Sequence, residues 1–329
     1  MAKKYQQFIH NCPIKARQRV NLSRFCTMRV GGPADLLVEA KTKSELVEVL
    51  RLAHKLGIKY FVLAGGSNVV FPDKGWRGLV VRYTANETEV VKPTCHSGEL
   101  TKRLQNRMNK SIRSWASQDD DGGTVEVEAG VMLGEMVRKL LKQGLGGFNF
   151  LANIPGSVGG AIVGNAGCYG KEIKDYLEEV EILNVKTGKI ARVKPKELAF
   201  DYRNSKLKQH PELIVLEATF KLDKIDKKQA LKEIAQEKQS RLDKHPQSPS
   251  CGSWFKNPSR DLPAWKLIDQ AGLRGATVGG ARVSNKHSNF IINYRSAGSS
   301  DITKLIQLVK KGVKQTTKVA LEEEAKLIK

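Results

Sequence analysis

Near the middle of the sequence lies Ile154-Pro155-Gly156-Ser157-Val158-Gly159-Gly160-Ala161, which continues to Asn165-Ala166-Gly167-Cys168-Tyr169-Gly170. So many glycines in one apolar stretch cost conformational entropy on folding. That cost is understandable if the backbone presses closely on a large flat or phosphate-bearing ligand. The alternative is a glycine-rich packing surface between structural elements, and the residues alone leave both interpretations open. Cys168 is expected to be a small buried side chain rather than a nucleophile.

Upstream of this stretch the sequence predicts a β-α-β arrangement. Residues 35–40 form a short strand, and a helix begins at the capping box Thr42-Lys43-Ser44-Glu45 and ends at Gly57. A second apolar strand, residues 60–64, ends at Gly65-Gly66-Ser67-Asn68. Two glycines allow positive φ there, and consecutive amides with polar side chains form a nest for anionic oxygens. A plain tight turn explains this pattern equally well.

Downstream of the glycine-rich stretch the composition changes. Residues 180–193 suggest a β-hairpin, and residues 213–222 an apolar strand. Residues 224–244 are charged and favour a helix, so a second structural unit is expected to begin near residue 223. In that unit a stripe at helical spacing predicts a core-facing helix; it consists of Ile302, Leu305, Ile306, Val309 and Val313. Residues 84–123 are polar with little periodicity and are interpreted as an inserted loop.

Two further segments contain residue types that are suited to chemistry. Arg203, between Tyr202 and Asn204, suits bidentate capture of a carboxylate or phosphate, with a strand-end salt bridge as the alternative. Ser253 lies beside Gly252 and bulky apolar residues, where a hydroxyl could donate a proton. A capped turn with a buried Trp254 is the alternative. The chain has no Gly-x-Ser-x-Gly nucleophile motif, so acyl transfer is not favoured.

Composition limits the class of protein. The chain has 329 residues, more than one average domain, with 56 Lys+Arg against 34 Asp+Glu and a net charge of +22. This surplus suits a polyanionic partner, but few aromatic residues accompany the lysine clusters, which disfavours a dedicated nucleic-acid-binding protein. The sequence shows no run of about 18 apolar residues, so no membrane-spanning helix is expected.

Targeting and metal signals are also missing from the sequence. The first residues do not resemble a secretory signal, so a cytoplasmic location is expected. The five cysteines are widely spaced without a Cys-x-x-Cys pair, and the six histidines show no metal-ligand spacing. Neither a metal site nor a disulfide framework is therefore predicted.

Taken together, these segments resemble the UDP-N-acetylenolpyruvoylglucosamine reductase family, flavoenzymes of bacterial peptidoglycan synthesis. The resemblance extends from Arg24 to the C-terminus. It rests on Arg29-Val30-Gly31-Gly32-Pro33-Ala34, Gly65-Gly66-Ser67-Asn68, Ile154-Pro155-Gly156-Ser157-Val158-Gly159-Gly160, Asn165-Ala166-Gly167, Tyr202-Arg203-Asn204-Ser205, Gly252-Ser253-Trp254-Phe255-Lys256-Asn257-Pro258, Ala271-Gly272-Leu273-Arg274-Gly275, Gly279-Gly280-Ala281 and His287-Ser288-Asn289-Phe290-Ile291.

The resemblance implies an α+β protein. After an N-terminal extension, residues 1–23, it implies a two-lobed FAD-binding domain of the vanillyl-alcohol-oxidase (PCMH) type over residues 24–222. Its lobes would span about 24–83 and 84–222, and a smaller α+β substrate-binding domain would follow over 223–329. FAD would be noncovalent, since no histidine falls in the glycine turns. NADPH would reduce it, and the flavin would reduce the vinyl ether of UDP-N-acetylglucosamine enolpyruvate to give UDP-N-acetylmuramate.

The resemblance also assigns roles to residues. Arg203 would pair with the substrate carboxylate, Ser253 would donate the proton, and Glu324, with Glu323 as nearest rival, would stabilise the developing charge. Residues that would hold substrate are Tyr202, Arg241 and Asn257, with Arg241 near the diphosphate. Residues that would hold FAD are Gly65, Gly66, Ser67, Asn68, Pro155, Gly156, Gly159, Gly160, Ala161 and Asn165. The short segment after Arg203 implies the subgroup without the tyrosine-bearing loop. The alternative within enzymes is a flavin oxidase that shares only the FAD domain.

Overall fold

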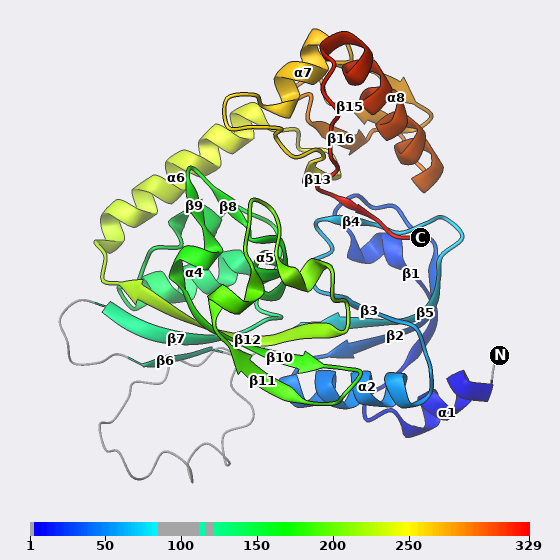
Figure 1. The fold of residues 1–329 in the computed structure, drawn as a ribbon, viewed down its shortest axis with the longest axis vertical. Coiled ribbons are helices and arrows are strands. Elements are labelled where there is room, and N and C mark those ends of the chain that lie inside the picture. The colour runs from blue at the N-terminus through cyan, green and yellow to red at the C-terminus, as the bar shows by residue number, and fades with distance from the viewer. Residues whose placement is uncertain (1–2, 85–111, 116–121) are drawn as a thin grey trace. The chain divides into compact units, whose positions relative to one another are not determined.

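The structure is a computed structural model that describes residues 3–84, 112–115 and 122–329 (Figure 1). Packing divides the chain into two compact units, each built from three segments. Unit 1 comprises Met1–Ala16, Val38–Ala64 and Leu79–Gln236. Unit 2 comprises Arg17–Leu37, Gly65–Gly78 and Glu237–Lys329. These units are defined by spatial packing rather than by chain order, so the sequential domain boundaries near residues 23 and 222 stay a prediction.

The expected β-α-β arrangement is present. Its four-stranded sheet has the order β1-β2-β5-β3, and β3 pairs parallel with β5. The elements of this region are α1 (Lys3–Asn11), β1 (Arg17–Asn21), β2 (Pro33–Ala40), α2 (Lys43–Lys55), β3 (Tyr60–Leu63) and β5 (Trp76–Tyr83). Thr42 caps α2, because its side chain accepts a hydrogen bond from Glu45 N at 3.2 Å. The expected capping box is only half formed, since the Glu45 carboxylate accepts from Lys41 N instead.

Unit 1 also contains a five-stranded antiparallel sheet, in the order β11-β10-β12-β7-β6. Its strands are β6 (Ile112–Trp115), β7 (Gly122–Glu128), β10 (Leu177–Asn184), β11 (Ile190–Val193) and β12 (Leu213–Asp223). The other elements are α4 (Leu133–Lys142), α5 (Val158–Gly164) and the short pair β8 (Gly167–Cys168) and β9 (Lys171–Glu172). The predicted hairpin is confirmed as β10 and β11. Most of the expected insertion over residues 84–123 lies outside the described residues, but its residues 112–115 are not loop, because they form strand β6 and pair with β7.

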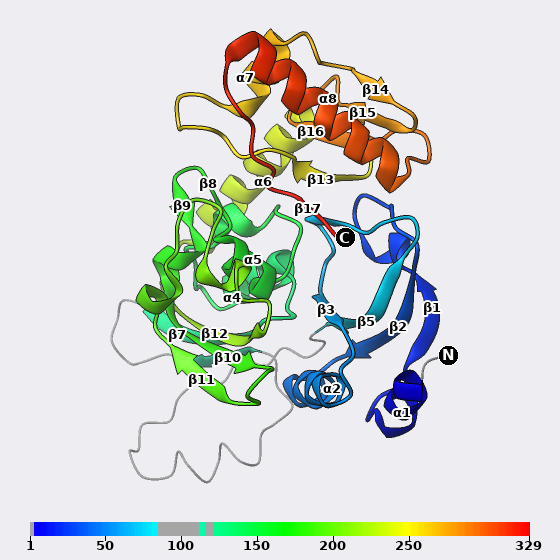
Figure 2. The same ribbon diagram turned by 45° about the vertical axis from the view of Figure 1, so that its right-hand side comes forward.

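Unit 2 has its own four-stranded sheet, in the order β13-β16-β15-β14. Its elements are β4 (Val69–Val70), β13 (Ser250–Ser253), α7 (Ala264–Gln270), β14 (Thr277–Val278), β15 (Ala281–Val283), β16 (Phe290–Asn293), α8 (Ser299–Thr317) and β17 (Lys326–Leu327). Helix α6 (Lys227–Lys244) runs along the chain from unit 1 into unit 2. Helix α8 packs across the sheet, and the five residues of its predicted stripe are all buried in one hydrophobic core with α7 (Figure 2).

Short 3-10 helices connect several of these elements. They are Leu22–Phe25, Asn149–Leu151, Ile173–Tyr176, Pro195–Leu198 and Lys206–Lys208. Within the described ranges, no helix is long and apolar enough to cross a membrane. The same residues contain no group of three or more His, Cys, Asp or Glu side chains placed to hold a metal ion.

Candidate active site

The predicted cofactor turn Gly65-Gly66-Ser67-Asn68 lies in unit 2, directly against residues 25–27. Gly66 has φ +59°, and a Cβ atom there would lie 2.0 Å from Phe25 O and 3.0 Å from Cys26 Cα. Thr27 N donates to Gly66 O at 3.1 Å. Only glycine fits this position, because both the backbone conformation and the close approach exclude a side chain.

The side chain of Asn68 contacts the C-terminal segment. The side-chain Nδ2 donates to Glu324 O at 3.2 Å, and the main-chain carbonyl of Asn68 accepts from Lys326 N at 3.0 Å. Strand β17 continues this contact by pairing parallel with β4, with Lys326 opposite Val69. The turn therefore holds the segment that contains the predicted catalytic carboxylate.

Ser253 ends strand β13 and is half-buried. The next two residues are clamped by Asn289, which is only 3% exposed. Its Oδ1 accepts from Phe255 N and its Nδ2 donates to Phe255 O, both at 2.9 Å, while its carbonyl accepts from Trp254 N at 2.7 Å. These three bonds imitate a strand pairing and fix the backbone immediately after Ser253.

The other edge of the same segment pairs with the C-terminal glutamates. Glu324 N donates to Trp254 O at 2.8 Å, and Lys256 N donates to Glu322 O at 2.9 Å. The Glu323 carboxylate pairs with Lys310 of α8, with Oε1 and Nζ 2.8 Å apart. Unit 2 thus brings together Ser253, Glu324 and the turn that ends at Asn68.

Two thiols lie buried beside these groups. The Cys251 Sγ donates to Val69 O at 3.7 Å, and Cys26 precedes Thr27. Burial raises the pKa of Cys26 and of Cys251 to about 12. Both thiols are therefore protonated at neutral pH and poor nucleophiles.

In unit 1 the glycines of the glycine-rich stretch differ in how closely other atoms approach them. Gly159 is a packing residue, because its N donates to Ala129 O at 2.8 Å and an added Cβ would meet Ala129 Cβ at 2.8 Å. At Gly160 an added Cβ would meet only Ser157 Oγ, at 3.5 Å, so the backbone is accessible there. Gly156 has φ +144° and precedes Ser157, which caps α5 through Gly160 N.

Asn165 ends α5 in a left-handed conformation, with φ +45°. It is fully buried, and its Nδ2 donates to Asp201 O at 3.0 Å. Its Oδ1 has no hydrogen-bond partner among the residues that the structure describes. A buried acceptor without a partner is costly, so it fits a donor supplied by a bound group such as a flavin.

Arg203 is attached to the same stretch. It has φ +54°, and its Nη2 donates to Gly167 O at 2.8 Å. Ser205 Oγ donates to Val163 O at 2.8 Å, and the exposed Tyr202 ring lies 5.6 Å from the Arg203 guanidinium. Unit 1 therefore brings the predicted carboxylate-binding arginine next to predicted FAD-binding residues.

The two remaining predicted substrate residues lie elsewhere in unit 2. Asn257 is exposed, and its Oδ1 accepts from Ala264 N at 3.0 Å at the start of α7. Arg241 lies near the end of α6, and its carbonyl accepts from His245 N at 2.8 Å. Burial lowers the pKa of His245 to about 4, so this side chain is neutral at physiological pH. The roles of Asn257 and Arg241 toward a substrate stay predictions.

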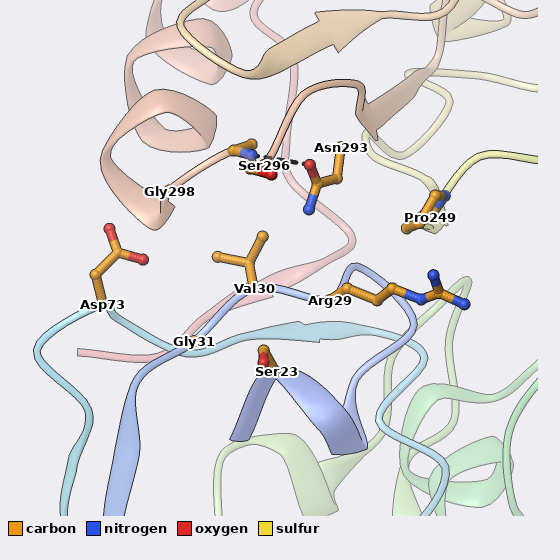
Figure 3. Close-up of a pocket in the computed structure, with 10 residues that line it drawn as sticks. Ser23, Arg29, Val30, Gly31, Asp73, Pro249, Asn293, Ser296 and Gly298 are labelled. Atoms are coloured by element: carbon orange, nitrogen blue, oxygen red, sulfur yellow. Dashed lines mark hydrogen bonds between the residues drawn. The ribbon is translucent and has the colours of Figure 1, made fainter. Parts of the chain in front are cut away.

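A cavity of about 520 Å³ lies apart from these groups in unit 2 (Figure 3). Its lining residues are Ser23, Arg29, Val30, Gly31, Asp73, Pro249, Asn293, Ser296, Ala297 and Gly298. None of the residues predicted to bind or react lines it. Its Asp73 carboxylate already accepts from Ser299 N at 2.9 Å, which caps α8.

Comparison with known proteins identifies the family. The UDP-N-acetylenolpyruvoylglucosamine reductase of Carboxydothermus hydrogenoformans is 39% identical over 306 residues, 92% of this chain and 91% of the relative. The chain belongs to the UDP-N-acetylenolpyruvoylglucosamine reductase family. The family member of Prochlorococcus marinus strain NATL2A is 38% identical over 314 residues, 95% of this chain and 98% of the relative.

Family models and a solved structure agree with this membership. Residues 75–194 match the FAD binding domain, and residues 244–328 match the C-terminal domain of the reductase. The crystal structure of the reductase from Thermus caldophilus superposes with a TM-score of 0.72 at 31% identity, over 96% of this chain and 100% of that chain. The α+β fold class with an FAD-binding domain is confirmed.

This family member is an FAD-dependent oxidoreductase. The alternative of an oxidase that shares only the FAD domain is wrong, because residues 244–328 match the reductase C-terminal domain. Sequence reasoning missed Thr27 and Asn289 as residues that organise the site. Asn289 lies within a motif of the resemblance, but neither residue type signals its long-range partner.

Proposed function

We propose that this enzyme reduces UDP-N-acetylglucosamine enolpyruvate to UDP-N-acetylmuramate with NADPH, as a cytoplasmic step of peptidoglycan precursor synthesis. The observation that carries the proposal is the hydrogen-bond chain from Asn68 through Glu324 to Trp254, at 3.2 and 2.8 Å. It joins the cofactor turn, the carboxylate segment and the residue after Ser253. Three groups with different predicted roles are thus fixed in one place.

The residues present fit the FAD that the family requires. By the family resemblance, the residues that would hold it are Gly65-Gly66-Ser67-Asn68 and those of the stretch from Pro155 to Asn165. The buried Oδ1 of Asn165 and the accessible backbone at Gly160 support this assignment. Bound FAD supplies the hydride that adds to the alkene carbon remote from the substrate carboxylate.

Residues of this chain would stabilise the charge that develops on the substrate and would donate the proton that completes the reduction. Negative charge develops next to the substrate carboxylate, and the Arg203 guanidinium, held by Gly167 O, would stabilise it as a planar fork. The Glu324 carboxyl group would stabilise the same charge by donating a hydrogen bond in its protonated form, because an ionised carboxylate would repel it. Such preorganised groups contribute about 3 kcal/mol each. Ser253 Oγ would then donate the proton to the carbon that bears this charge. A serine hydroxyl is a weak acid, so the transfer depends on that carbon's basicity.

Substrate binding would use the remaining residues. Tyr202 is exposed beside Arg203, and Asn257 is exposed at the start of α7. Arg241 would pair with the diphosphate of the nucleotide. We propose these contacts for the substrate.

Stopped-flow absorbance of the flavin tests the proposed reaction. The holoenzyme is reduced with NADPH without oxygen and then mixed with UDP-N-acetylglucosamine enolpyruvate. Rapid return of the oxidised flavin spectrum, with formation of UDP-N-acetylmuramate, is expected. A reduced flavin that stays reduced for minutes with this substrate would contradict the proposal.

Arg203→Lys tests the carboxylate pairing. Lysine keeps the charge but cannot form the fork, nor keep the guanidinium bond to Gly167 O. We expect flavin reoxidation by the enolpyruvyl substrate to slow on the order of a hundredfold, with flavin content unchanged. Turnover close to that of the wild type would remove Arg203 from the substrate carboxylate.

Glu324→Gln and Glu323→Gln form a matched pair that separates the two candidate carboxylates. The Glu323 carboxylate is held by Lys310, so its replacement loses only a partly exposed ion pair. We expect Glu324→Gln to lower kcat about a hundredfold and Glu323→Gln to change it less than about fivefold. The reverse order, measured by steady-state kinetics, would assign the role to Glu323.

A further inference from the structure

Thr27 connects two segments of unit 2 that have different predicted roles. Its N donates to Gly66 O at 3.1 Å in the cofactor turn. Its Oγ1 lies 2.6 Å from Ser250 O, at the start of the strand that ends in Ser253, and 3.5 Å from Ser67 O. The short contact identifies Ser250 O as the acceptor of the single hydroxyl proton.

A second contact between this strand and the cofactor-turn region is made by Cys251. The Cys251 Sγ contact to Val69 O is long, at 3.7 Å, and a thiol is a weak donor. The Asn289 clamp and Glu324 act on Trp254 and Phe255, after Ser253. The opposite edge of the strand pairs with β16, with Ser250 opposite Ile292, and Asn293 N donates to Pro249 O at 2.9 Å. The Thr27 hydroxyl therefore joins the start of this strand to the cofactor turn.

We propose that Thr27 is a positioning residue, whose hydroxyl sets the distance of Ser253 from the cofactor turn and thereby the rate of proton donation to the substrate. The proposal rests on the proposed function of Ser253. Thr27 itself touches neither the substrate nor the reacting atoms in this role. A displacement of the donor by about 1 Å is enough to slow a reaction on the order of a hundredfold.

Thr27→Val and Thr27→Ser test the role. Valine keeps the shape and the backbone bond to Gly66 O but removes the hydroxyl, whereas serine restores it. Thr303→Val is the matched control, because the Thr303 hydroxyl donates to Ser299 O at 2.8 Å on α8, away from the site. Each holoenzyme is measured for flavin reduction by NADPH, for flavin reoxidation by UDP-N-acetylglucosamine enolpyruvate, and for amide hydrogen exchange.

The expected result is specific to one half-reaction. Thr27→Val should slow reoxidation about 10- to 100-fold with little change in KM, leave flavin reduction and flavin content unchanged, and accelerate amide exchange in residues 250–255. Thr27→Ser and Thr303→Val should both behave like the wild type. Because amide exchange needs no substrate, it reports on the strand whichever reaction the enzyme performs.

Other outcomes overturn the proposal. Unchanged exchange in Thr27→Val would show that the hydroxyl does not hold the strand, and equal loss of both half-reactions would indicate a general structural role. Failure of Thr27→Ser to restore the rate would also contradict it. If the flavin of the wild type is not reoxidised by the enolpyruvyl compound, the proposed function fails. Accelerated amide exchange in Thr27→Val would in that case still show that the Thr27 hydroxyl holds the strand.

Discussion

Ser253→Ala should leave the reduction of the flavin by NADPH intact and slow its reoxidation by the enolpyruvyl substrate about 10²- to 10⁴-fold, the usual range for a lost general acid. The backbone around Ser253 should not change, because Asn289 and Glu324 hold the following residues through main-chain groups. The change therefore removes a proton donor and little else. Stopped-flow measurement of each half-reaction gives the two rates separately.

The control for this prediction is Ser300→Ala, an exposed position on α8. It should alter neither half-reaction. A solvent deuterium isotope effect that is present on reoxidation in the wild type and lost in Ser253→Ala would support proton transfer from this hydroxyl. If both half-reactions of Ser253→Ala fall by the same factor, the assignment of the proton donor is wrong.

Gly66→Val should produce protein that purifies with little or no FAD. An added Cβ would overlap Phe25 O at 2.0 Å, and valine disfavours φ +59°. Because the turn cannot move away from residues 25–27 without breaking the bond from Thr27 N to Gly66 O, the nest for the cofactor is lost. The ratio of flavin absorbance to protein absorbance measures this loss directly.

Gly57→Val is a control that separates the effect of backbone strain from the effect of steric overlap with neighbouring atoms. Gly57 has the same φ, +59°, but an added Cβ would have no atom within 4 Å. This variant should retain FAD and lose only about 1–3 kcal/mol of unfolding free energy to backbone strain. Full flavin content in Gly66→Val would remove that turn from the cofactor site.

The elements that sequence predicts best are those governed by local rules. The α8 stripe is buried as expected, because its period of about 3.6 residues leaves one face for the core. Thr42 caps α2 because its side-chain oxygen accepts from Glu45 N, an N–H of the first turn that has no acceptor within the helix. The second half of the predicted capping box is wrong, since the Glu45 carboxylate accepts a hydrogen bond from Lys41 N.

The long-range partners could not be predicted in the same way. Asn68 was expected to bind an anionic cofactor, yet its side chain also donates to Glu324 O, 256 residues away in sequence. Gly159 is glycine because Ala129 packs against it, and no local pattern distinguishes such a glycine from one that faces a ligand. The division of unit 2 into three segments likewise depends on tertiary packing, which a single sequence does not encode locally.

The pairing of β17 with β4 has a consequence for the order of events in the cell. A ribosome makes Val69 long before Lys326, so β4 has no partner strand until Lys326 and Leu327 have been synthesised. The nascent chain can fold much of unit 1 before then, but it cannot place Glu324. Chains that stop before this strand also lack Leu327, which packs against the hydrophobic core of unit 2.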